Sequence, residues 1–150
     1  MRRHLFYLLI IALAFVACDP ENPDYDAIDE AKIKDYITEH NINATRSNSG
    51  LYYFIEESGN DMHPTHNSLV RVKYVGMLLD STVFDQTSDS PVSLTLNNTI
   101  KGFSEGVQLI GVGGKIKLFI PSSLGYGVNE KPKIPKNSVL IFDIELVEFY

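Results

Sequence analysis

The chain has 150 residues with 44% hydrophobic and 21% charged side chains, which predicts one folded domain and excludes a chain that is disordered throughout. Its formal net charge of −6 and its lack of a run of basic residues argue against nucleic-acid binding, which requires a concentrated basic patch. The single cysteine excludes an internal disulfide.

Residues 1–17 predict a cleaved export signal. Arg2 and Arg3 are followed by an unbroken apolar run from Leu5 to Ala17. As a helix this run would be only about 20 Å long, against a hydrocarbon core of about 30 Å, so it favours a signal peptide over a membrane-spanning helix. Without the two leader arginines the chain has 11 basic and 19 acidic residues, a net charge of −8.

Cys18 follows the leader directly and is predicted to be the site of lipid attachment. The string Phe15-Val16-Ala17-Cys18 resembles the lipobox of bacterial lipoproteins, in which an apolar pair and a small residue precede an invariant cysteine. An unpaired cysteine in an exported protein agrees with this role, and the alternative is a spare cysteine in a leader that is cleaved just beyond it. A lipid at Cys18 implies anchoring in the bacterial cell envelope, with the outer membrane favoured. Periplasmic and surface-facing placement are both left open.

Two segments connect the leader to the rest of the chain. Residues 18–26 are acidic, interrupted by proline and without apolar periodicity, which predicts a tether. Residues 27–50 predict an N-terminal helix, over 27–40, and a polar linker. The helix is indicated by apolar residues at helical spacing, namely Ile28, Ala31, Ile33, Tyr36 and Ile37. Its role is left open between packing on the domain, dimerisation and lying free near the membrane.

The remaining chain, 51–150, has the composition of a small β-rich domain. Stretches rich in β-branched and aromatic residues predict strands over 51–57, 69–79, 91–96, 115–121 and 139–149. One helix is predicted between them, over 100–110, with Thr99 as its N-cap. Five or six strands with hairpin-length connections predict an α+β fold, in which an antiparallel sheet wraps over this helix.

Several kinds of site find no support in the sequence. The glycines within 111–114 follow the helix and precede a strand, so they predict a helix stop and a tight turn rather than a phosphate-binding loop. His63 and His66 lie in a polar loop without a cysteine or a helical frame, which argues against a metal site. The sequence contains no nucleophile elbow. We therefore expect no metal and no other cofactor.

Five segments of the chain carry a family resemblance. They are Val70 to Asp80 with Val83 to Asp85, Ile100 to Val107, Gly113 to Pro121, Leu124 to Gly127, and Ile134 to Leu146. In this order they resemble FKBP-type peptidyl-prolyl cis-trans isomerases, and with the leader they resemble the bacterial lipoproteins of this family that are associated with gliding motility. The resemblance implies a half-barrel sheet of five to six antiparallel strands around one short helix, preceded here by an N-terminal helix.

The resemblance also implies a pocket for proline. Its catalytic residues would be Tyr74, Phe84, Asp85, Ile100 through its backbone N–H, Phe103, Tyr126 and Phe142, and its other substrate-binding residues Val92, Thr99 and Ile134. Phe103 would form the floor, where the family usually has Trp, so a macrolide is a candidate ligand with weakened affinity. The basic residue that often pairs with Asp85 is missing, so backbone or tyrosine donors are expected for this carboxylate. A purely structural core is the alternative for the aromatic residues, and it is the role expected for Phe119 and Phe149.

Such a pocket suits the isomerisation of an X–Pro bond. The barrier of roughly 18–20 kcal/mol arises because the planar amide loses resonance as it twists, and no covalent bond breaks. Catalysis needs only a site that binds the twisted amide better than the planar one. We therefore expect an isomerase that acts on exported polypeptides containing X–Pro bonds. The alternatives are a non-catalytic lipoprotein that binds Pro-containing segments within a secretion or gliding-type envelope complex, and a structural domain with a vestigial pocket.

Overall fold

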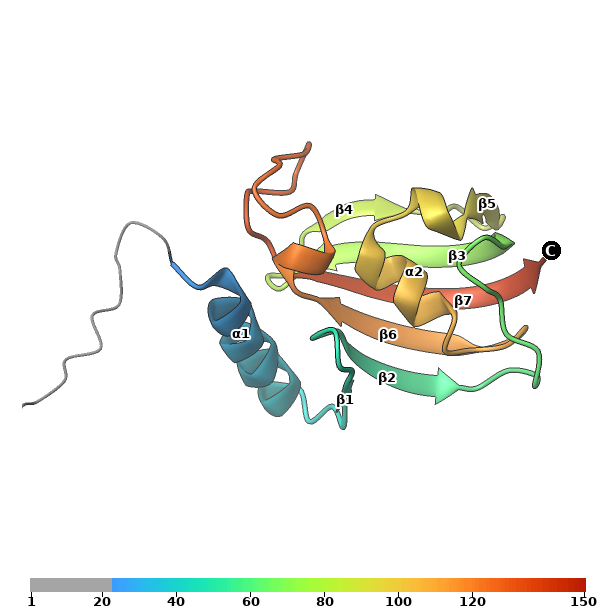
Figure 1. Ribbon diagram of the computed structural model, residues 1–150, viewed down its shortest axis with the longest axis horizontal. Coiled ribbons are helices and arrows are strands. Elements are labelled where there is room, and N and C mark those ends of the chain that lie inside the picture. The colour runs from blue at the N-terminus through green and yellow to red at the C-terminus, as the bar shows by residue number, and fades with distance from the viewer. Residues whose placement is uncertain (1–22) are drawn as a thin grey trace, which may run out of the picture.

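An antiparallel sheet curves around one short helix, and a longer helix lies against one end of the sheet (Figure 1). The computed structural model describes residues 23–150. The predicted signal peptide, Cys18 and most of the predicted tether lie outside the described residues. None of the helices in the described part of the chain is long and apolar enough to cross a membrane.

The sheet contains seven strands. They are β1 (Thr45–Arg46), β2 (Tyr52–Glu57), β3 (Leu69–Leu78), β4 (Val83–Gln86), β5 (Val92–Thr95), β6 (Lys115–Ile120) and β7 (Leu140–Phe149). Their order is β1-β2-β6-β7-β3-β4, with β5 also paired to β3, and every pair is antiparallel. The predicted α+β fold is confirmed. The two strands beyond the five predicted segments are β1 and β4, which have two and four residues.

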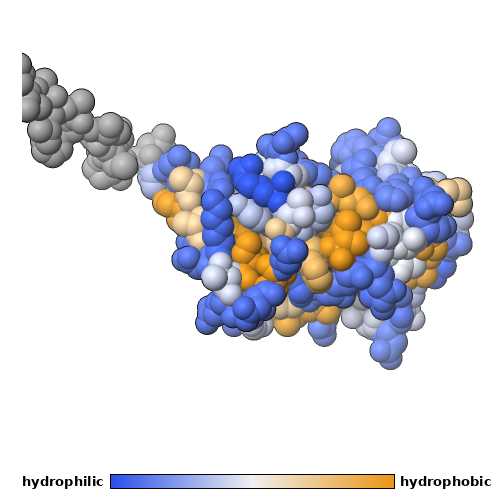
Figure 2. Space-filling view, turned by 90° about the horizontal axis from the view of Figure 1, so that it is seen from below, coloured by the Kyte–Doolittle hydropathy of each residue, from blue (hydrophilic) through white to orange (hydrophobic). Residues whose placement is uncertain are grey.

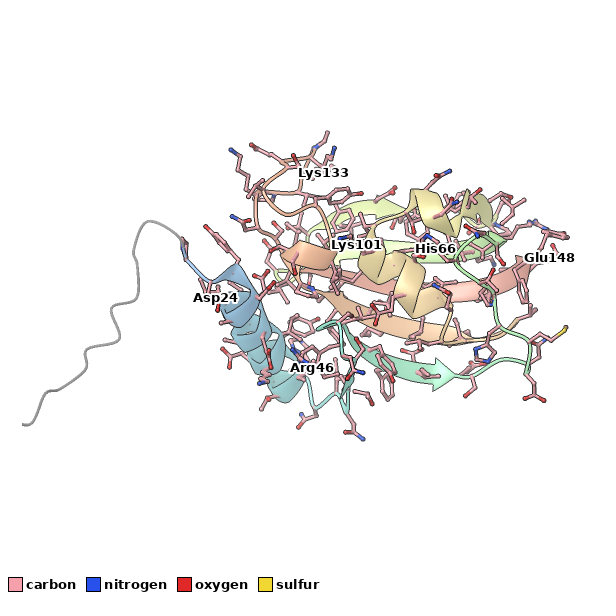
Figure 3. The ribbon with its side chains drawn as sticks, in the orientation of Figure 1. Asp24, Arg46, His66, Lys101, Lys133 and Glu148 are labelled. Atoms are coloured by element: carbon pink, nitrogen blue, oxygen red, sulfur yellow. The ribbon has the colours of Figure 1, made fainter. Side chains whose placement is uncertain are left out.

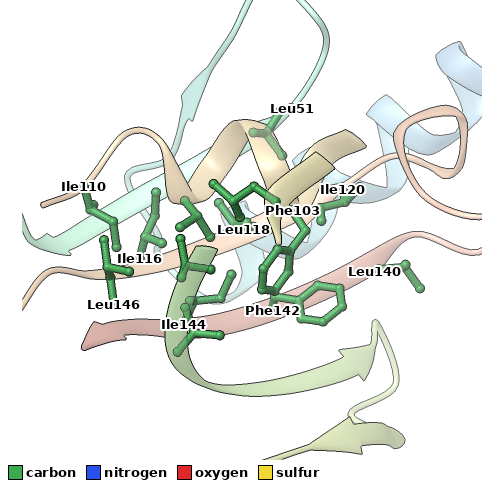
Figure 4. Close-up of a cluster of buried hydrophobic side chains, with 14 of the residues drawn as sticks. Leu51, Phe103, Ile110, Ile116, Leu118, Ile120, Leu140, Phe142, Ile144 and Leu146 are labelled. Carbon is green, nitrogen blue, oxygen red and sulfur yellow. The ribbon is translucent and has the colours of Figure 1, made fainter. Parts of the chain in front are cut away.

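The concave face of the sheet is covered by α2 (Lys101–Val107), whose buried side chains join the hydrophobic cluster drawn in Figure 4. Gly102 and Gly106 face β6. A Cβ on Gly102 would lie 2.5 Å from Cγ2 of Ile120, and a Cβ on Gly106 would overlap the side chain of Leu118. The missing side chains therefore let the helix lie close to the strand, at the density of a protein interior.

The two ends of α2 differ from those predicted. The helix begins at Lys101, with Ile100 as an N-cap residue that makes no side-chain cap. The prediction of Thr99 as the N-cap is wrong, because its hydroxyl donates instead to the Leu96 carbonyl at 2.7 Å. The helix also ends before residue 110, since the N–H groups of Leu109 and Ile110 bond to carbonyls three residues back rather than four.

The N-terminal helix α1 (Tyr25–Glu39) packs on the domain, which is one of the three roles left open by the sequence. Ile33 is fully buried in a second hydrophobic cluster, together with Phe119 of β6 and Ile141 of β7. Phe119 and Ile141 are paired across the two strands. Because successive side chains of a strand point to opposite faces, this cluster lies across the sheet from α2.

The bounds and faces of α1 correct the predicted pattern. Asp24 is its N-cap and accepts a hydrogen bond from the Ala27 N–H at 3.2 Å, so the helix starts within the segment predicted as tether. Of the predicted apolar positions, Ile28 and Ala31 are exposed. The predicted linker is likewise not wholly irregular, because it contains β1.

The convex face of the sheet carries charges of alternating sign. The register places Lys73, Glu145, Lys115 and Glu57 beside one another on four neighbouring strands. Lys115 donates to Glu57 at 2.7 Å, and this hydrogen bond raises the pKa of Lys115. Opposite charges on neighbouring strands stabilise antiparallel pairing. Figure 2, which views the molecule from below, shows several hydrophobic areas with hydrophilic side chains around them.

Candidate functional site

A cavity of about 330 Å³ opens at one end of the concave face, between α2, the central strands and the segment that follows β6. The residues that line it are Tyr74, Asp85, Leu94, Asn98, Thr99, Ile100, Phe103, Tyr126 and Phe142. Tyr74 comes from β3 and Phe142 from β7, while Phe103 reaches the cavity from α2. Residues from six separate stretches of the chain therefore meet here only because the sheet curves around the helix.

Aromatic rings form the inner wall of the cavity. Phe103 and Phe142 are only 3% and 6% exposed, and their ring centroids lie 5.3 Å apart at an interplanar angle of 82°. Tyr74 meets Phe103 edge to face, with centroids 5.9 Å apart. Edge-to-face contacts of this kind fix the orientation of each ring. Figure 4 shows Phe103 and Phe142 together at the edge of the hydrophobic cluster, so the cavity wall and the core are continuous.

Gly76 makes room for these rings. It lies opposite Phe142 of β7 on one side and opposite Asp85 of β4 on the other. A Cβ at this position would lie 2.6 Å from a ring carbon of Phe84 and 2.9 Å from one of Phe142. Phe84 in turn packs edge to face on Phe142, with centroids 5.5 Å apart. The glycine is therefore required by the packing of the two phenylalanines behind the cavity.

A short polar pair lies at the rim. The Tyr74 hydroxyl donates to Oδ2 of Asp85 at 2.6 Å. Burial of the phenol and its hydrogen bond to the carboxylate both raise the pKa of Tyr74 above its usual value of 10.0. No lysine or arginine pairs with Asp85 among the described residues. The tyrosine donor expected for this carboxylate is thus Tyr74.

Ile100, which also lines the cavity, has a backbone N–H without a partner among the described residues. Ile100 has an extended conformation, with φ −62° and ψ 150°, immediately before α2. Its carbonyl accepts from the Ser104 N–H, but its own N–H makes no hydrogen bond within residues 23–150. This N–H is therefore available to a carbonyl oxygen of a bound ligand.

Tyr126 closes the cavity from a turn rather than from a strand. It follows a 3₁₀ turn at Ser122–Leu124 and lies between Gly125 and Gly127, the second of which has φ +56°. The Nζ of Lys131 lies 5.6 Å from the Tyr126 ring centroid. The loop beyond Tyr126, which carries Lys133, projects past the end of the sheet (Figure 3).

Comparison with known proteins agrees with this geometry. Residues 60–147 match the family model described as FKBP-type peptidyl-prolyl cis-trans isomerase. The chain belongs to this family. The family resemblance drawn from the sequence is confirmed.

Individual FKBP relatives extend the match beyond the family model. The chain is 40% identical over 131 residues to FKBP-type peptidyl-prolyl cis-trans isomerase FkpA of Aeromonas hydrophila, which covers 83% of this chain and 48% of the relative. It is 41% identical over 128 residues to FkpA of Escherichia coli (strain K12), which covers 82% and 47%. The chain thus spans about half the length of these curated relatives.

Solved FKBP structures share the fold. The crystal structure of FkpA from Escherichia coli superposes with a TM-score of 0.73 at 40% identity, covering 83% of this chain and 60% of that one. A peptidyl-prolyl cis-trans isomerase from Pseudomonas syringae gives a TM-score of 0.70 at 27% identity, covering 85% and 97%.

Three of the residues predicted for the FKBP pocket do not line the cavity. Phe84 supports Phe142 from behind, and Ile134 is buried in the core cluster. Val92 is exposed on β5, and Leu94, two residues further along the same face, lines the cavity in its place. The sequence analysis missed Leu94 and Asn98. Leu94 could have been found from the two-residue period of the strand.

Other hollows on this FKBP domain lack aromatic walls of this kind. One of them, of about 530 Å³, lies on the convex face and is lined mainly by charged side chains, including Lys73, Lys115 and Glu145. Another, of about 430 Å³, lies beside α2 and is lined mostly by polar residues, among them His66 and Lys101. The described residues include no group of three or more side chains suited to holding a metal ion.

Proposed function

We propose that the protein is a peptidyl-prolyl cis-trans isomerase that binds the twisted X–Pro amide in the aromatic cavity. The observation that carries the proposal is the meeting of buried rings with polar groups at the rim, in a chain that belongs to the FKBP family. In the twisted state the amide carbonyl and nitrogen are less conjugated. A dry aromatic wall therefore favours this state over the hydrated planar one.

Each group has a role in this proposal. Phe103 is the floor on which the proline ring lies, and Phe142 and Tyr126 enclose it. The Ile100 N–H donates to a substrate carbonyl and so fixes the orientation of the peptide. Asp85 holds the Tyr74 ring in place through its hydrogen bond. Because its carboxylate also lines the cavity, it can accept a hydrogen bond from a backbone N–H group of the substrate.

Exchange NMR on a short X–Pro peptide tests this function. The purified full-length chain should accelerate cis-trans exchange, and Asp85→Ala and Phe142→Ala should each lower kcat/KM at least about tenfold, which is a loss of about 1.4 kcal/mol of transition-state binding. Asp89→Ala is the matched control, because this exposed carboxylate lies outside the cavity. A folded wild-type protein without acceleration would refute the enzyme and favour the non-catalytic binding of Pro-containing segments in an envelope complex.

The proposed site of action is the bacterial cell envelope, and the proposed clients are exported polypeptides containing X–Pro bonds. The support is the leader over residues 1–17 followed by the lone Cys18, which resembles a lipidation site. In a bacterial host the chain should incorporate a labelled fatty acid and fractionate with the outer membrane. Cys18→Ser should abolish both. Labelling of Cys18→Ser equal to that of wild type would contradict the anchor.

Phe103 bears on macrolides as ligands. Phenylalanine offers less surface than the tryptophan usual in the family and lacks the indole N–H, so we expect weak macrolide binding. Phe103→Trp should tighten binding about tenfold, since the larger ring buries more apolar area under the ligand. Isothermal titration calorimetry with rapamycin as the probe measures this, alongside an unfolding curve that verifies the fold. Equal or weaker affinity in a folded Phe103→Trp protein would contradict the expectation.

A further inference from the structure

We propose that Asp29 of α1 is a positioning residue for Tyr126, so that the N-terminal helix forms part of the isomerase site. The proposal rests on the proposed function, since Tyr126 encloses the bound proline. It assigns a task to a segment that lies outside the matched residues 60–147.

Asp29 is a buried carboxylate with one strong partner. It is 0% exposed, and its Oδ2 accepts a hydrogen bond from the backbone N–H of Ser122 at 2.8 Å. The other oxygen lies 3.5 Å from Nζ of Lys32 and makes no hydrogen bond within the described chain. Burying a charged group is costly, and aspartate is rarely buried unless it is paired. The hydrogen bond from Ser122 explains its place here, because it satisfies one of the two buried carboxyl oxygens.

Ser122 passes this restraint on to Tyr126. Its carbonyl accepts from the N–H of Gly125 at 3.0 Å and from the N–H of Gly127 at 2.8 Å. These two glycines are the neighbours of Tyr126 on either side. Asp29 therefore restrains the backbone of Ser122, and Ser122 in turn restrains the residues on both sides of Tyr126. Two successive hydrogen bonds connect a side chain of α1 to the backbone of the cavity wall.

The position of α1 fits this task. The 3₁₀ turn at Ser122–Leu124, orange in Figure 1, lies between α1 and α2 and contacts α1. Ser122 is itself only 3% exposed, so water does not replace the carboxylate as its acceptor. The glycines at 125 and 127 give the backbone of the turn conformational freedom. The hydrogen bond to Asp29 limits this freedom.

The neighbouring residue Glu30 provides a matched control. Its carboxylate accepts from the Tyr52 hydroxyl at 3.1 Å and from Arg46 at 3.3 Å, and it pairs with Lys34 at 2.7 Å. These partners lie on α1, β1 and β2, away from the cavity, and Arg46 is visible beside α1 in Figure 3. Glu30 thus fastens the same helix to the same sheet without touching the Tyr126 turn.

The test compares Asp29→Ala, Asp29→Asn and Glu30→Ala in the full-length chain, with amide hydrogen exchange and kcat/KM as readouts. In Asp29→Ala the Gly125 and Gly127 amides should exchange at least about tenfold faster, although neither is bonded to Asp29, while β6 and β7 amides keep their protection. The value of kcat/KM should fall about five- to tenfold because the Tyr126 ring is less well placed. Asp29→Asn should remain within about twofold of wild type in both, since its amide oxygen accepts the same N–H. Glu30→Ala should leave both readouts unchanged.

Two results would overturn the proposal. One is unchanged exchange at Gly125 and Gly127 in Asp29→Ala, and the other is an equal effect of Glu30→Ala. If Asp29→Ala does not fold, Asp29→Leu removes the acceptor while filling the space, and the same criteria apply to it. If wild type shows no isomerase activity, the proposed function fails on its own. The exchange readout still decides whether Asp29 holds the turn.

Discussion

The shape of the cavity depends on Gly76, although this residue does not itself line it. Its two cross-strand partners, Phe142 and Asp85, both line the cavity, and the space above its Cα is filled by the rings of Phe84 and Phe142. The residue touches no ligand in the proposed mechanism. It still determines where the rings lie, because any side chain here would occupy their volume.

Gly76→Ala should therefore reduce stability and activity together. Overpacking a close-packed interior costs about 1–3 kcal/mol, and here the added methyl group displaces the rings of the cavity wall. Urea unfolding and exchange NMR measure the two effects. Gly113→Ala is the control: Gly113 has φ +84° but nothing within 4 Å of its added Cβ, so this change should cost stability and leave kcat/KM unchanged. Full activity in Gly76→Ala would contradict the argument.

Tyr74 predicts a pH dependence of stability. Burial and the hydrogen bond to Asp85 raise its pKa in the folded protein above the usual 10.0. The neutral phenol is thus favoured by folding. This contribution is fully present below pH 10 and is lost as the pH rises from there through the folded pKa. The free energy of unfolding of wild type should fall more steeply above pH 10 than that of Tyr74→Phe. Equal slopes in the two proteins, measured by urea unfolding between pH 9 and 12, would show that Tyr74 has no raised pKa.

Helix α2 illustrates the competition between intrinsic propensity and packing. It has only seven residues, two of which are glycines that disfavour a helix by about 1 kcal/mol each relative to alanine. Isolated helices of this length do not form in water, so the element is held by its contacts with β6. Gly102 and Gly106 allow those contacts, four residues apart on the face that meets Ile120 and Leu118.

Gly106→Ala should consequently destabilise the protein despite its better helix propensity. We expect a net loss of about 1–3 kcal/mol from the overlap with Leu118. Chemical unfolding measures the loss, with Lys101→Ala at an exposed position of the same helix as the control. A stabilised Gly106→Ala protein would mean that Leu118 of β6 can move to accommodate the methyl group. The close approach of helix and strand would then not depend on the glycine.

The molecule as a whole was only partly predictable from its sequence. Five stretches of β-branched and aromatic residues predicted five of the seven strands. The family resemblance predicted seven of the residues that line the cavity, namely Tyr74, Asp85, Thr99, Ile100, Phe103, Tyr126 and Phe142. The sequence could not show that Phe84 and Ile134 lie behind the cavity wall rather than in it. An apolar residue type is equally compatible with either position. Asp29 was missed for a related reason. An aspartate in an amphipathic helix predicts a solvated face, although its spacing of four residues from Ile33 places it on the buried one.

The packing of α1 on the sheet predicts that helix and sheet unfold as one unit. Ile33 shares a cluster with Phe119 and Ile141, and Asp29 is bonded to Ser122, so the helix has few contacts of its own without the domain. The NMR signals of Ile33 and Ile141 should therefore disappear at the same urea concentration. Loss of the Ile33 signal at clearly lower urea would identify α1 as a separate unit.

Phe103 and Phe142 belong to the hydrophobic core and to the cavity wall at once. This double membership limits how the protein can evolve or be engineered. A substitution that reshapes the pocket for a new ligand also changes the core, so it draws on the same small reserve of folding free energy that keeps the domain native. Variants selected for altered ligand preference should accordingly be recovered more often from a background first stabilised at distant positions than from the natural chain.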